Sequence, residues 1–261
     1  MSRIFIGLDR DGTIDMPGLP APARLVEQLR GMQQDGAKVF IASGKSYDVL
    51  KEVCAGLGLE PWMYCCENGG HIVIPHTGRE YVFSEGTDLA FFIAHVGELA
   101  LPPSRDEPKR SIWSKKFGGE SLAAKRVIDE FVARHGLRLS VFAYPDGDGG
   151  LDVVPDGIDK SNLLRLLPED AVVHFFGDGE NDLGIMRSDG VVPHTVANGK
   201  RAVKQCVAEK GGHIADEPAG YGVCSVLAQL RAEWRAARVA GYMLPGLCIG
   251  GLRDEPRARN S

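Results

Sequence analysis

The 261-residue sequence has no apolar run of the roughly 18 residues that a membrane-spanning helix needs. It has no excess of basic residues either, because 30 Lys and Arg stand against 35 Asp and Glu, a formal net charge of -5. Nucleic-acid-binding domains carry clustered positive charge. The composition therefore predicts a protein that binds neither membranes nor nucleic acids.

The six cysteines form no C-x-x-C pair, which is the spacing typical of zinc sites. We expect no secretory signal, because the apolar run near the N-terminus is short and acidic residues follow it at once. These two features predict a protein of the reducing cytoplasm. A hydrophobic content of 44% and a charged content of 25% are those of a globular chain, which excludes general disorder.

Short apolar runs alternate with amphipathic segments in two separate parts of the chain. Buried strands are predicted at 3–8, 37–42, 62–66, 171–176 and 191–196. Helices are predicted around 25–32 and 49–57 and at 160–167, 200–209 and 222–235. Alternation of this kind indicates parallel strands with right-handed crossovers. The predicted fold is α/β, with a Rossmann-like, doubly wound parallel sheet as its core.

The segment between the two alternating parts has a different pattern. It contains a Pro-Pro pair, a basic stretch, one helical segment at 122–135 and two strand-like runs at 137–143 and 151–154. We interpret it as a smaller α+β cap domain inserted into the core. The predicted division is 1–80 for the first core part, 81–154 for the cap, 155–237 for the second core part and 238–261 for a C-terminal tail. The tail is expected to pack on the core or to be disordered, with a partner surface as the alternative.

Polar side chains follow the predicted core strands. Asp9 and Asp11 end the first strand, Ser43 ends the second, and Asp178 and Asp182 follow the strand at 171–176. Open α/β sheets bind ligands beyond the carboxyl ends of their strands. We therefore expect these segments to converge at one edge of the sheet, with Lys160 beside them.

The two acids of the Asp9-Arg10-Asp11-Gly12 stretch can divide a reaction between them. An ordinary Asp, with a pKa of about 3.9, is ionised at neutral pH. Asp9 can therefore act as a nucleophile, and Asp11 as a general acid and base. A polar turn at the end of a strand is the alternative interpretation, whereas a calcium loop is excluded because its remaining ligands are missing.

Asp178 and Asp182 would add two carboxylates to Asp9 and Asp11. Four clustered carboxylates repel one another, and a hard cation such as Mg²⁺, which prefers oxygen ligands, would relieve that repulsion. The alternative for the second pair is a helix N-terminus that acidic residues favour. Ser43 and Gly44 offer a hydroxyl and N–H groups to an anion. Lys160 is either a surface lysine or a clamp for phosphate and nucleophile.

Four motifs in this order resemble those of the haloacid dehalogenase superfamily of phosphohydrolases. They are Leu8-Asp9-Arg10-Asp11-Gly12-Thr13, Ile41-Ala42-Ser43-Gly44, Lys160, and Gly177 to Asp182. The inserted α+β cap, Glu67-Asn68-Gly69-Gly70 and the segment from Val153 to Lys160 resemble subclass IIB. Arg10 departs from the usual pattern, and the tail beyond about residue 235 has no counterpart in it.

The resemblance implies a role for each matching residue. Asp9 forms an aspartyl phosphate, while Asp11 protonates the leaving alcohol and then activates water. Mg²⁺ is held by Asp9, by the backbone carbonyl of Asp11 and by Asp178, with Asp182 as a direct or water-mediated ligand. The phosphoryl group is held by these residues: Ser43, Gly44 and Lys160, with Asn181 in support.

The predicted function is a Mg²⁺-dependent phosphatase that acts on a small phosphorylated sugar or organic acid. The alternatives are a phosphosugar mutase on the same scaffold and a non-catalytic sugar-phosphate-binding protein. The sequence leaves the substrate and the oligomeric state open. The basic stretch of the cap either is a solvated loop or recognises a second anionic group: Arg105, Lys109, Arg110, Lys115 and Lys116.

Overall fold

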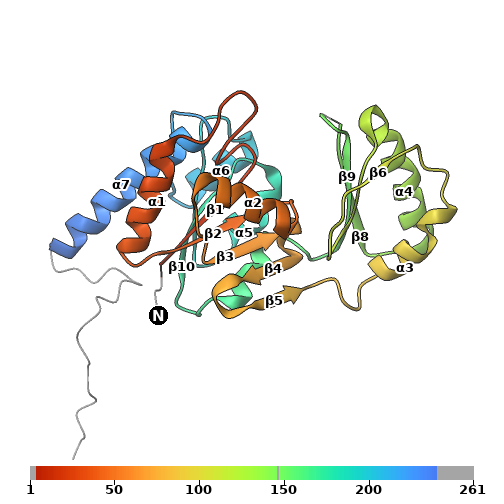
Figure 1. Cartoon of the computed structure of the whole chain (residues 1–261), viewed down its shortest axis with the longest axis horizontal. Coiled ribbons are helices and arrows are strands. Elements are labelled where there is room, and N and C mark those ends of the chain that lie inside the picture. Colours follow the sequence, from red (N-terminus) through yellow and green to blue (C-terminus); the bar gives the residue numbers. More distant parts are fainter. Residues whose placement is uncertain (1–3, 146, 240–261) are drawn as a thin grey trace, which may run out of the picture.

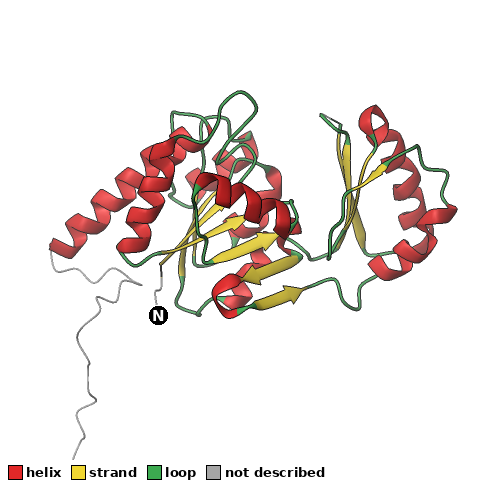
Figure 2. Ribbon diagram, in the orientation of Figure 1, coloured by secondary structure: helices red, strands yellow, loops and turns green. Residues whose placement is uncertain are grey.

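Two β-sheets organise the computed structural model, which describes residues 4–145 and 147–239 (Figures 1 and 2). The larger sheet has the strand order β11-β10-β1-β2-β3-β4-β5, and the smaller has the order β6-β7-β9-β8. The strands of the larger sheet are β1 (Ile4–Asp9), β2 (Lys38–Ala42), β3 (Met63–Cys66), β4 (His71–Ile74), β5 (Arg79–Val82), β10 (Val172–Phe176) and β11 (Val191–His194). The strands of the smaller sheet are β6 (Arg105–Asp106), β7 (Trp113–Lys116), β8 (Leu139–Tyr144) and β9 (Gly150–Pro155).

Helices cover both faces of the larger sheet. The helices of the chain are α1 (Ala23–Gln34), α2 (Tyr47–Leu57), α3 (Leu89–His95), α4 (Ser121–His135), α5 (Leu183–Arg187), α6 (Arg201–Glu209) and α7 (Ala219–Val239). Helices α1, α2 and α7 pack on one face, and α5, α6 and the 3-10 helix η5 (Lys160–Leu166) pack on the other. The predicted α/β fold with a doubly wound core is confirmed.

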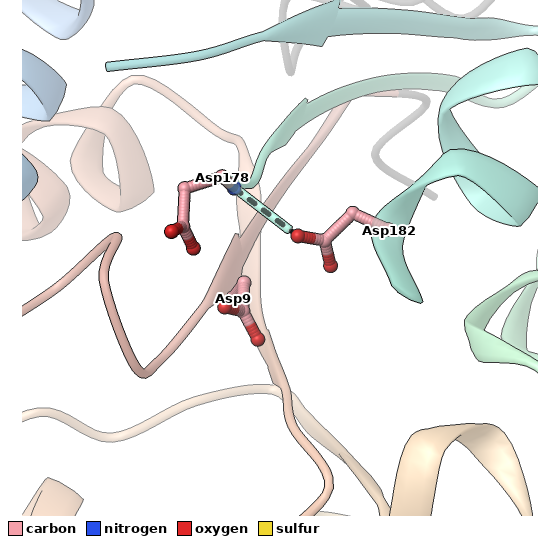
Figure 3. A group of neighbouring side chains, drawn as sticks. All are labelled: Asp9, Asp178 and Asp182. Atoms are coloured by element: carbon pink, nitrogen blue, oxygen red, sulfur yellow. Dashed lines mark hydrogen bonds between the residues drawn. The ribbon is translucent and has the colours of Figure 1, made fainter. Parts of the chain in front are cut away.

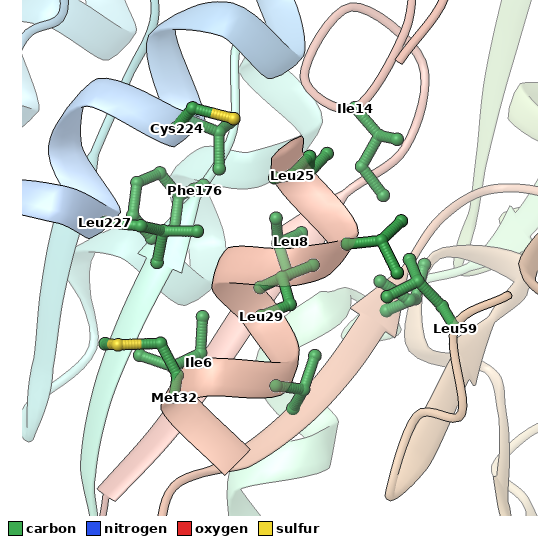
Figure 4. Close-up of a cluster of buried hydrophobic side chains, with 14 of the residues drawn as sticks. Ile6, Leu8, Ile14, Leu25, Leu29, Met32, Leu59, Phe176, Cys224 and Leu227 are labelled. Carbon is green, nitrogen blue, oxygen red and sulfur yellow. The ribbon is translucent and has the colours of Figure 1, made fainter. Parts of the chain in front are cut away.

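Each face of the larger sheet has its own apolar core. Successive side chains of a strand point to opposite faces, so Ile4, Ile6 and Leu8 face α1 and α7 while Phe5 faces the other layer. Figure 4 shows Ile6 and Leu8 packed against Leu29 and Met32 of α1 and Leu227 of α7. Burial on both faces explains why β1 is a continuous apolar run rather than an alternating one.

The larger sheet is parallel except at one edge. Strands β11, β10, β1, β2 and β3 are parallel, but β3–β4 and β4–β5 pair antiparallel. Only the short turn Glu67–Gly69 separates β3 from β4. A parallel crossover needs a dozen or more residues, so this connection permits only a hairpin.

Other elements differ from their predictions in detail. The segment predicted as a helix at 160–167 is the 3-10 helix η5, and two short helices, α3 and α5, were not predicted. The smaller sheet, α3 and α4 fall within the range predicted for the cap, and the helices lie on the side of that sheet away from the core (Figure 2). The domain boundaries stay a prediction, and most of the predicted tail at 238–261 lies outside the described residues.

The described helices include none with the length and apolar character required to cross a bilayer.

Three stacked histidines occupy the end of the larger sheet next to α7. His174 and His194 are buried, and the backbone N–H of His213 donates to His194 Nδ1 at 3.1 Å. His194 must therefore carry its proton on Nε2, from which it donates to His174 Nδ1 at 3.0 Å. Burial, followed by the neighbouring His213, lowers the pKa of His174 to about 4. These bonds require neutral rings for His174 and His194.

The stack predicts a pH-dependent contribution to stability. Between pH 6.5 and about 4 the unfolded chain protonates His174 while the folded chain does not, so the contribution of His174 falls as pH falls. When the pH falls from 7 to 4, we expect the wild type to lose about 3 kcal/mol more unfolding free energy than His174→Gln loses. Urea denaturation measures it. The exposed His76→Gln is the control, and a difference for His174→Gln that does not change with pH would contradict this account.

Candidate active site

Three aspartates meet at the carboxyl edge of the larger sheet. Asp9 ends β1, Asp178 follows the adjacent parallel strand β10, and Asp182 lies in the 3-10 helix η6 (Glu180–Asp182). One carboxylate oxygen from each lies within 4.8 Å of the others, and Figure 3 shows the three side chains around a common point. The sequence placed these residues at the ends of strands, and the parallel pairing of β1 with β10 brings them together.

Lys160 joins two of these acids from the start of η5. Its Nζ donates to Asp9 Oδ1 and to Asp182 Oδ1, both at 2.6 Å, and its side chain is fully buried. Burial by itself lowers the pKa of Lys160, but the carboxylates of Asp182 and Asp9 raise it above its ordinary value. Lys160 is therefore a permanent ammonium group that fixes the position of the Asp9 carboxylate.

The site carries more negative charge than Lys160 neutralises. Burial raises the pKa of Asp9, while the adjacent ammonium group of Lys160 opposes that rise and favours the ionised carboxylate. Burial, and then the charge of Asp182, raises the pKa of Asp178 to about 6. Both shifts have the direction expected where carboxylates share too few counter-charges. A hard divalent cation fits this donor set, because it would add the missing positive charge and it prefers oxygen ligands.

Asp182 uses both of its carboxylate oxygens within the protein. Oδ1 accepts from Lys160, and Oδ2 accepts from the backbone N–H groups of Asp178 at 3.1 Å and Gly179 at 3.0 Å (Figure 3). Asp182 therefore holds Lys160 and the turn that carries Asp178 in one fixed arrangement.

Asp178 is supported by two residues that the sequence reasoning missed as site residues. Thr13 Oγ1 donates to Asp178 Oδ1 at 3.3 Å, and Asn198 Nδ2 lies 3.5 Å from Asp178 Oδ2 and donates to the carbonyl of Gly12 at 2.8 Å. Asn198 follows β11, so the same rule of strand ends identifies it. A β-carbon on Gly12, whose φ is +84°, would lie 2.4 Å from Asp178 Oδ2, so this close approach requires glycine.

The residues predicted to bind phosphate lie along the same edge. Ser43 is buried directly after β2, and its Oγ accepts from the backbone N–H of Lys45 at 3.3 Å. Gly44 lies against the amide of Asn68, and Asn181 Nδ2 is 3.5 Å from Asn68 Oδ1. Asn68 thus contacts two of the predicted phosphate-binding residues, although the sequence reasoning gave it no role.

Asp11 stands apart from the acidic cluster. Among the described residues, the group of converging carboxylates contains Asp9, Asp178 and Asp182 but not Asp11. The Asp11 side chain is 55% exposed and pairs with Arg10, which also contacts Asp15 at 3.3 Å. A cavity of about 500 Å³ opens beside it, lined by residues 10–12 and 15–20. The side chain of Asp11 is therefore at the solvent side of the site, while its backbone follows Asp9 directly.

The basic residues of the cap are not free cations. Lys109 is nearly buried and donates to Asp152 at 3.0 Å, and each of the other four also pairs with a carboxylate. Arg105 and Arg110 are nonetheless mostly exposed to solvent, so the two predicted interpretations of this stretch stay predictions. The four remaining pairs are Arg105–Asp148, Arg110–Glu80, Lys115–Asp106 and Lys116–Glu107.

Comparison with known proteins decides the family. A family model described as haloacid dehalogenase-like hydrolase matches residues 6–94. A phosphomannomutase of Oryza sativa subsp. indica is 42% identical over 239 residues, which cover 76% of this chain and 92% of the relative. This chain belongs to the haloacid dehalogenase superfamily. A phosphomannomutase of Triticum aestivum is 45% identical over 233 residues, with the same coverage of 76% and 92%.

Solved structures of other superfamily members share the fold of this haloacid dehalogenase-type chain. The sucrose-phosphatase of Synechocystis, solved with sucrose and phosphate, has a TM-score of 0.64 at 18% identity, and the match covers 88% of this chain and 99% of that one. A subclass IIB sugar phosphatase has a TM-score of 0.58 at 16% identity, with coverage of 92% and 99%. The resemblance to subclass IIB is confirmed at the level of the fold.

The buried Lys160 predicts a large cost when its charge is removed. Lys160→Met leaves Asp9 and Asp182 without their shared counter-ion, and breaking a buried ion pair in this way costs about 3–5 kcal/mol of unfolding free energy. Lys125→Met is the matched control, because Lys125 pairs with Asp129 on an exposed helical face, where the loss is below about 1 kcal/mol. Equal effects in urea denaturation at pH 7 would contradict the ion-pair account.

Proposed function

We propose that this protein hydrolyses the phosphate ester of a small phosphorylated sugar, with Asp9 as the nucleophile. The observation that carries the proposal is the position of Asp9, buried at the end of β1 with one oxygen held at 2.6 Å by Lys160. A fixed carboxylate next to a permanent cation is what an attack on a phosphoryl group requires, because the negative charge spreads over the phosphoryl oxygens during transfer.

The reaction has two steps on these residues. An Asp9 oxygen bonds to phosphorus while the ester P–O bond breaks, and Asp11 gives its proton to the departing sugar oxygen. Water then attacks the phosphorus of the aspartyl phosphate, Asp11 takes the proton of that water, and Asp9 is released with inorganic phosphate. The partly exposed side chain of Asp11 is on the solvent side, where the alcohol leaves and the water enters.

Mg²⁺ is the cofactor that the acidic cluster fits. Asp9 and Asp178 would hold it with the backbone carbonyl of Asp11, and bound Mg²⁺ would supply positive charge for the phosphoryl oxygens. Both oxygens of Asp182 already accept hydrogen bonds, which favours a water-mediated role for Asp182 over direct ligation. Thr13 and Asn198 keep the Asp178 carboxylate in place.

Asp9→Asn removes the nucleophile while keeping the shape of the side chain. We expect release of inorganic phosphate from sugar phosphates to fall by at least about 10³-fold, with a folded protein by circular dichroism, because the covalent route is lost. Asp189→Asn, an exposed position, is the control. Phosphate release near the wild-type rate by Asp9→Asn would refute the assigned nucleophile.

Binding of Mg²⁺ is expected to stabilise the folded chain, since only the folded chain brings the carboxylates together. Millimolar Mg²⁺ should raise the melting temperature of the wild type and of Asp189→Asn, but not that of Asp178→Asn. Differential scanning calorimetry with and without EDTA measures this independently of catalysis. An Mg²⁺-induced shift of equal size in Asp178→Asn would remove Asp178 from the metal site.

A phosphosugar mutase is the second candidate, favoured by the relatives named phosphomannomutase. A mutase uses the same aspartyl phosphate but returns the phosphoryl group to another hydroxyl of a sugar rather than to water. The two reactions differ in their products. With a hexose 1-phosphate and a trace of hexose 1,6-bisphosphate, a phosphatase releases inorganic phosphate, whereas a mutase forms hexose 6-phosphate. The absence of both products across a panel of sugar phosphates would favour a non-catalytic binding protein.

A further inference from the structure

The turn between β3 and β4 is strained. Glu67 and Asn68 have φ angles of +53° and +54°, followed by Gly69 at +92°. Glycine adopts this left-handed region freely, and Asn is tolerated there, but Glu is not favoured. Non-glycine residues held in this region cost of order 1–3 kcal/mol each and persist only where the surroundings fix them. The contacts that fix this turn therefore show which of its residues are held in a defined position.

Glu67 anchors the turn to the segment that leads into β7 of the smaller sheet. Its buried carboxylate accepts from the backbone N–H of Arg110 at 2.9 Å, and from the backbone N–H of Ser111 at 2.7 Å and the Ser111 hydroxyl at 2.6 Å. Three donors on one buried carboxylate offset the backbone strain. The conformation of residue 67 is thus set by the connection between the two sheets.

Gly69 anchors the other end of the turn to the catalytic lysine segment. A β-carbon on Gly69 would lie 2.0 Å from the carbonyl oxygen of Asp159, next to Lys160. Asn162 Nδ2 also donates to the carbonyl of Gly69 at 3.3 Å. The turn is therefore fixed on both sides, and Asn68 lies at its centre.

The side chain of Asn68 lies among residues of the proposed phosphate site. Its backbone N–H donates to the carbonyl of Ser43 at 3.0 Å, its amide lies against Gly44, and its Oδ1 accepts from Asn181 at 3.5 Å. That bond uses the acceptor oxygen of Asn68 and leaves the two N–H donors of its Nδ2 group for Tyr144 and a ligand. Its position beside Ser43 and Gly44 places it where the first atoms beyond the phosphoryl group would lie.

Tyr144 of β8 approaches Asn68 from the smaller sheet. Strand alternation directs Leu139 and Val141 into the apolar core with α4, so Phe142 and Tyr144 point to the opposite face, the one toward the larger sheet. Both aromatic side chains are exposed there. Tyr144 is only half-exposed, and the burial of its remaining surface, followed by the charge of Asp152, raises its pKa, while a hydrogen bond with Asn68 opposes that rise. Asn68, which follows β3 of the larger sheet, therefore lies next to Tyr144 of the smaller sheet.

We propose that Asn68, held by the left-handed turn Glu67–Gly69, binds a hydroxyl group of the sugar next to the phosphoryl group, between Gly44 and Tyr144. This inference rests on the proposed action on sugar phosphates and adds the residue that recognises the sugar. Glu67 is a positioning residue, because it acts through the backbone of Asn68. An amide is suited to a sugar hydroxyl since it both donates and accepts hydrogen bonds.

Asn68→Gly tests binding of the sugar without disturbing the fold of the turn. Glycine accepts the left-handed backbone, so this variant keeps the turn but loses the amide. The matched control is Ala219→Gly. Ala219 lies at the start of α7 with a φ of +45°, so its replacement by glycine relieves backbone strain in the same way.

Binding is measured by calorimetry in Asp9→Asn protein, which does not turn over its ligand, with a panel of hexose 1- and 6-phosphates and with phenyl phosphate. We expect Asn68→Gly to weaken the tightest hexose phosphate about tenfold or more, the loss of about one hydrogen bond. Phenyl phosphate, which has no hydroxyl groups, should change less than about threefold. Ala219→Gly should change neither ligand.

Equal weakening of both ligands, or of neither, overturns the proposal, as does a panel in which no hexose phosphate binds. The test is separate from that of the proposed function. If hexose phosphates bind through Asn68 but wild-type protein releases no phosphate from them, the assigned hydrolysis fails and the sugar contact stands. If phosphate is released but Asn68→Gly binds hexose phosphates normally, only the sugar contact fails.

Discussion

The arrangement of the site depends on one buried ammonium group shared by two carboxylates. Lys160 is enclosed at the carboxyl edge of the larger sheet and donates at 2.6 Å to both Asp9 and Asp182. Burying any one of these charges alone would be costly, so each is retained only because the others are present. The same contacts bring β1, η5 and η6 together, although these elements are far apart in the sequence. The contacts of Lys160 therefore both hold these elements together and set the position of the Asp9 carboxylate.

That ion-pair network leaves the site electrostatically incomplete. Asp178 adds a third carboxylate without adding a cation, and burial raises the pKa of both Asp9 and Asp178. A protein that only needed stability would not keep this excess, since replacing such groups by apolar ones is often neutral or stabilising. The proposed phosphoryl ligand and its divalent cation would account for this excess. The hydrogen bonds of Thr13 and Asn198 to Asp178 support the same interpretation, because they fix a carboxylate that is not needed for packing.

The core strands and the acidic edge could be predicted from the sequence because their signals are local. Strand β1 is an unbroken apolar run that ends in Asp9. The carboxyl ends of parallel strands all lie at the same edge of a sheet, so the position of Asp9 follows from its place at the end of the strand. The antiparallel strand β5 has no such signal, since its Arg79–Val82 segment is polar and half-exposed. Asn68 contacts Asn181, which lies 113 residues away in the sequence, and no local pattern indicates that contact. The pairing of the cap lysines with acids is equally non-local.

The central claim is that a carboxylate oxygen of Asp9, the residue that Lys160 holds in place, becomes bonded to phosphorus during turnover. The most direct measurement is an acid quench of the wild-type protein during turnover of a hexose phosphate with Mg²⁺, followed by peptide mass spectrometry. The account predicts a phosphoryl adduct on the peptide that contains Asp9, absent from Asp9→Asn protein treated in the same way. Turnover without an adduct on that peptide, or with the adduct on another residue, would contradict it.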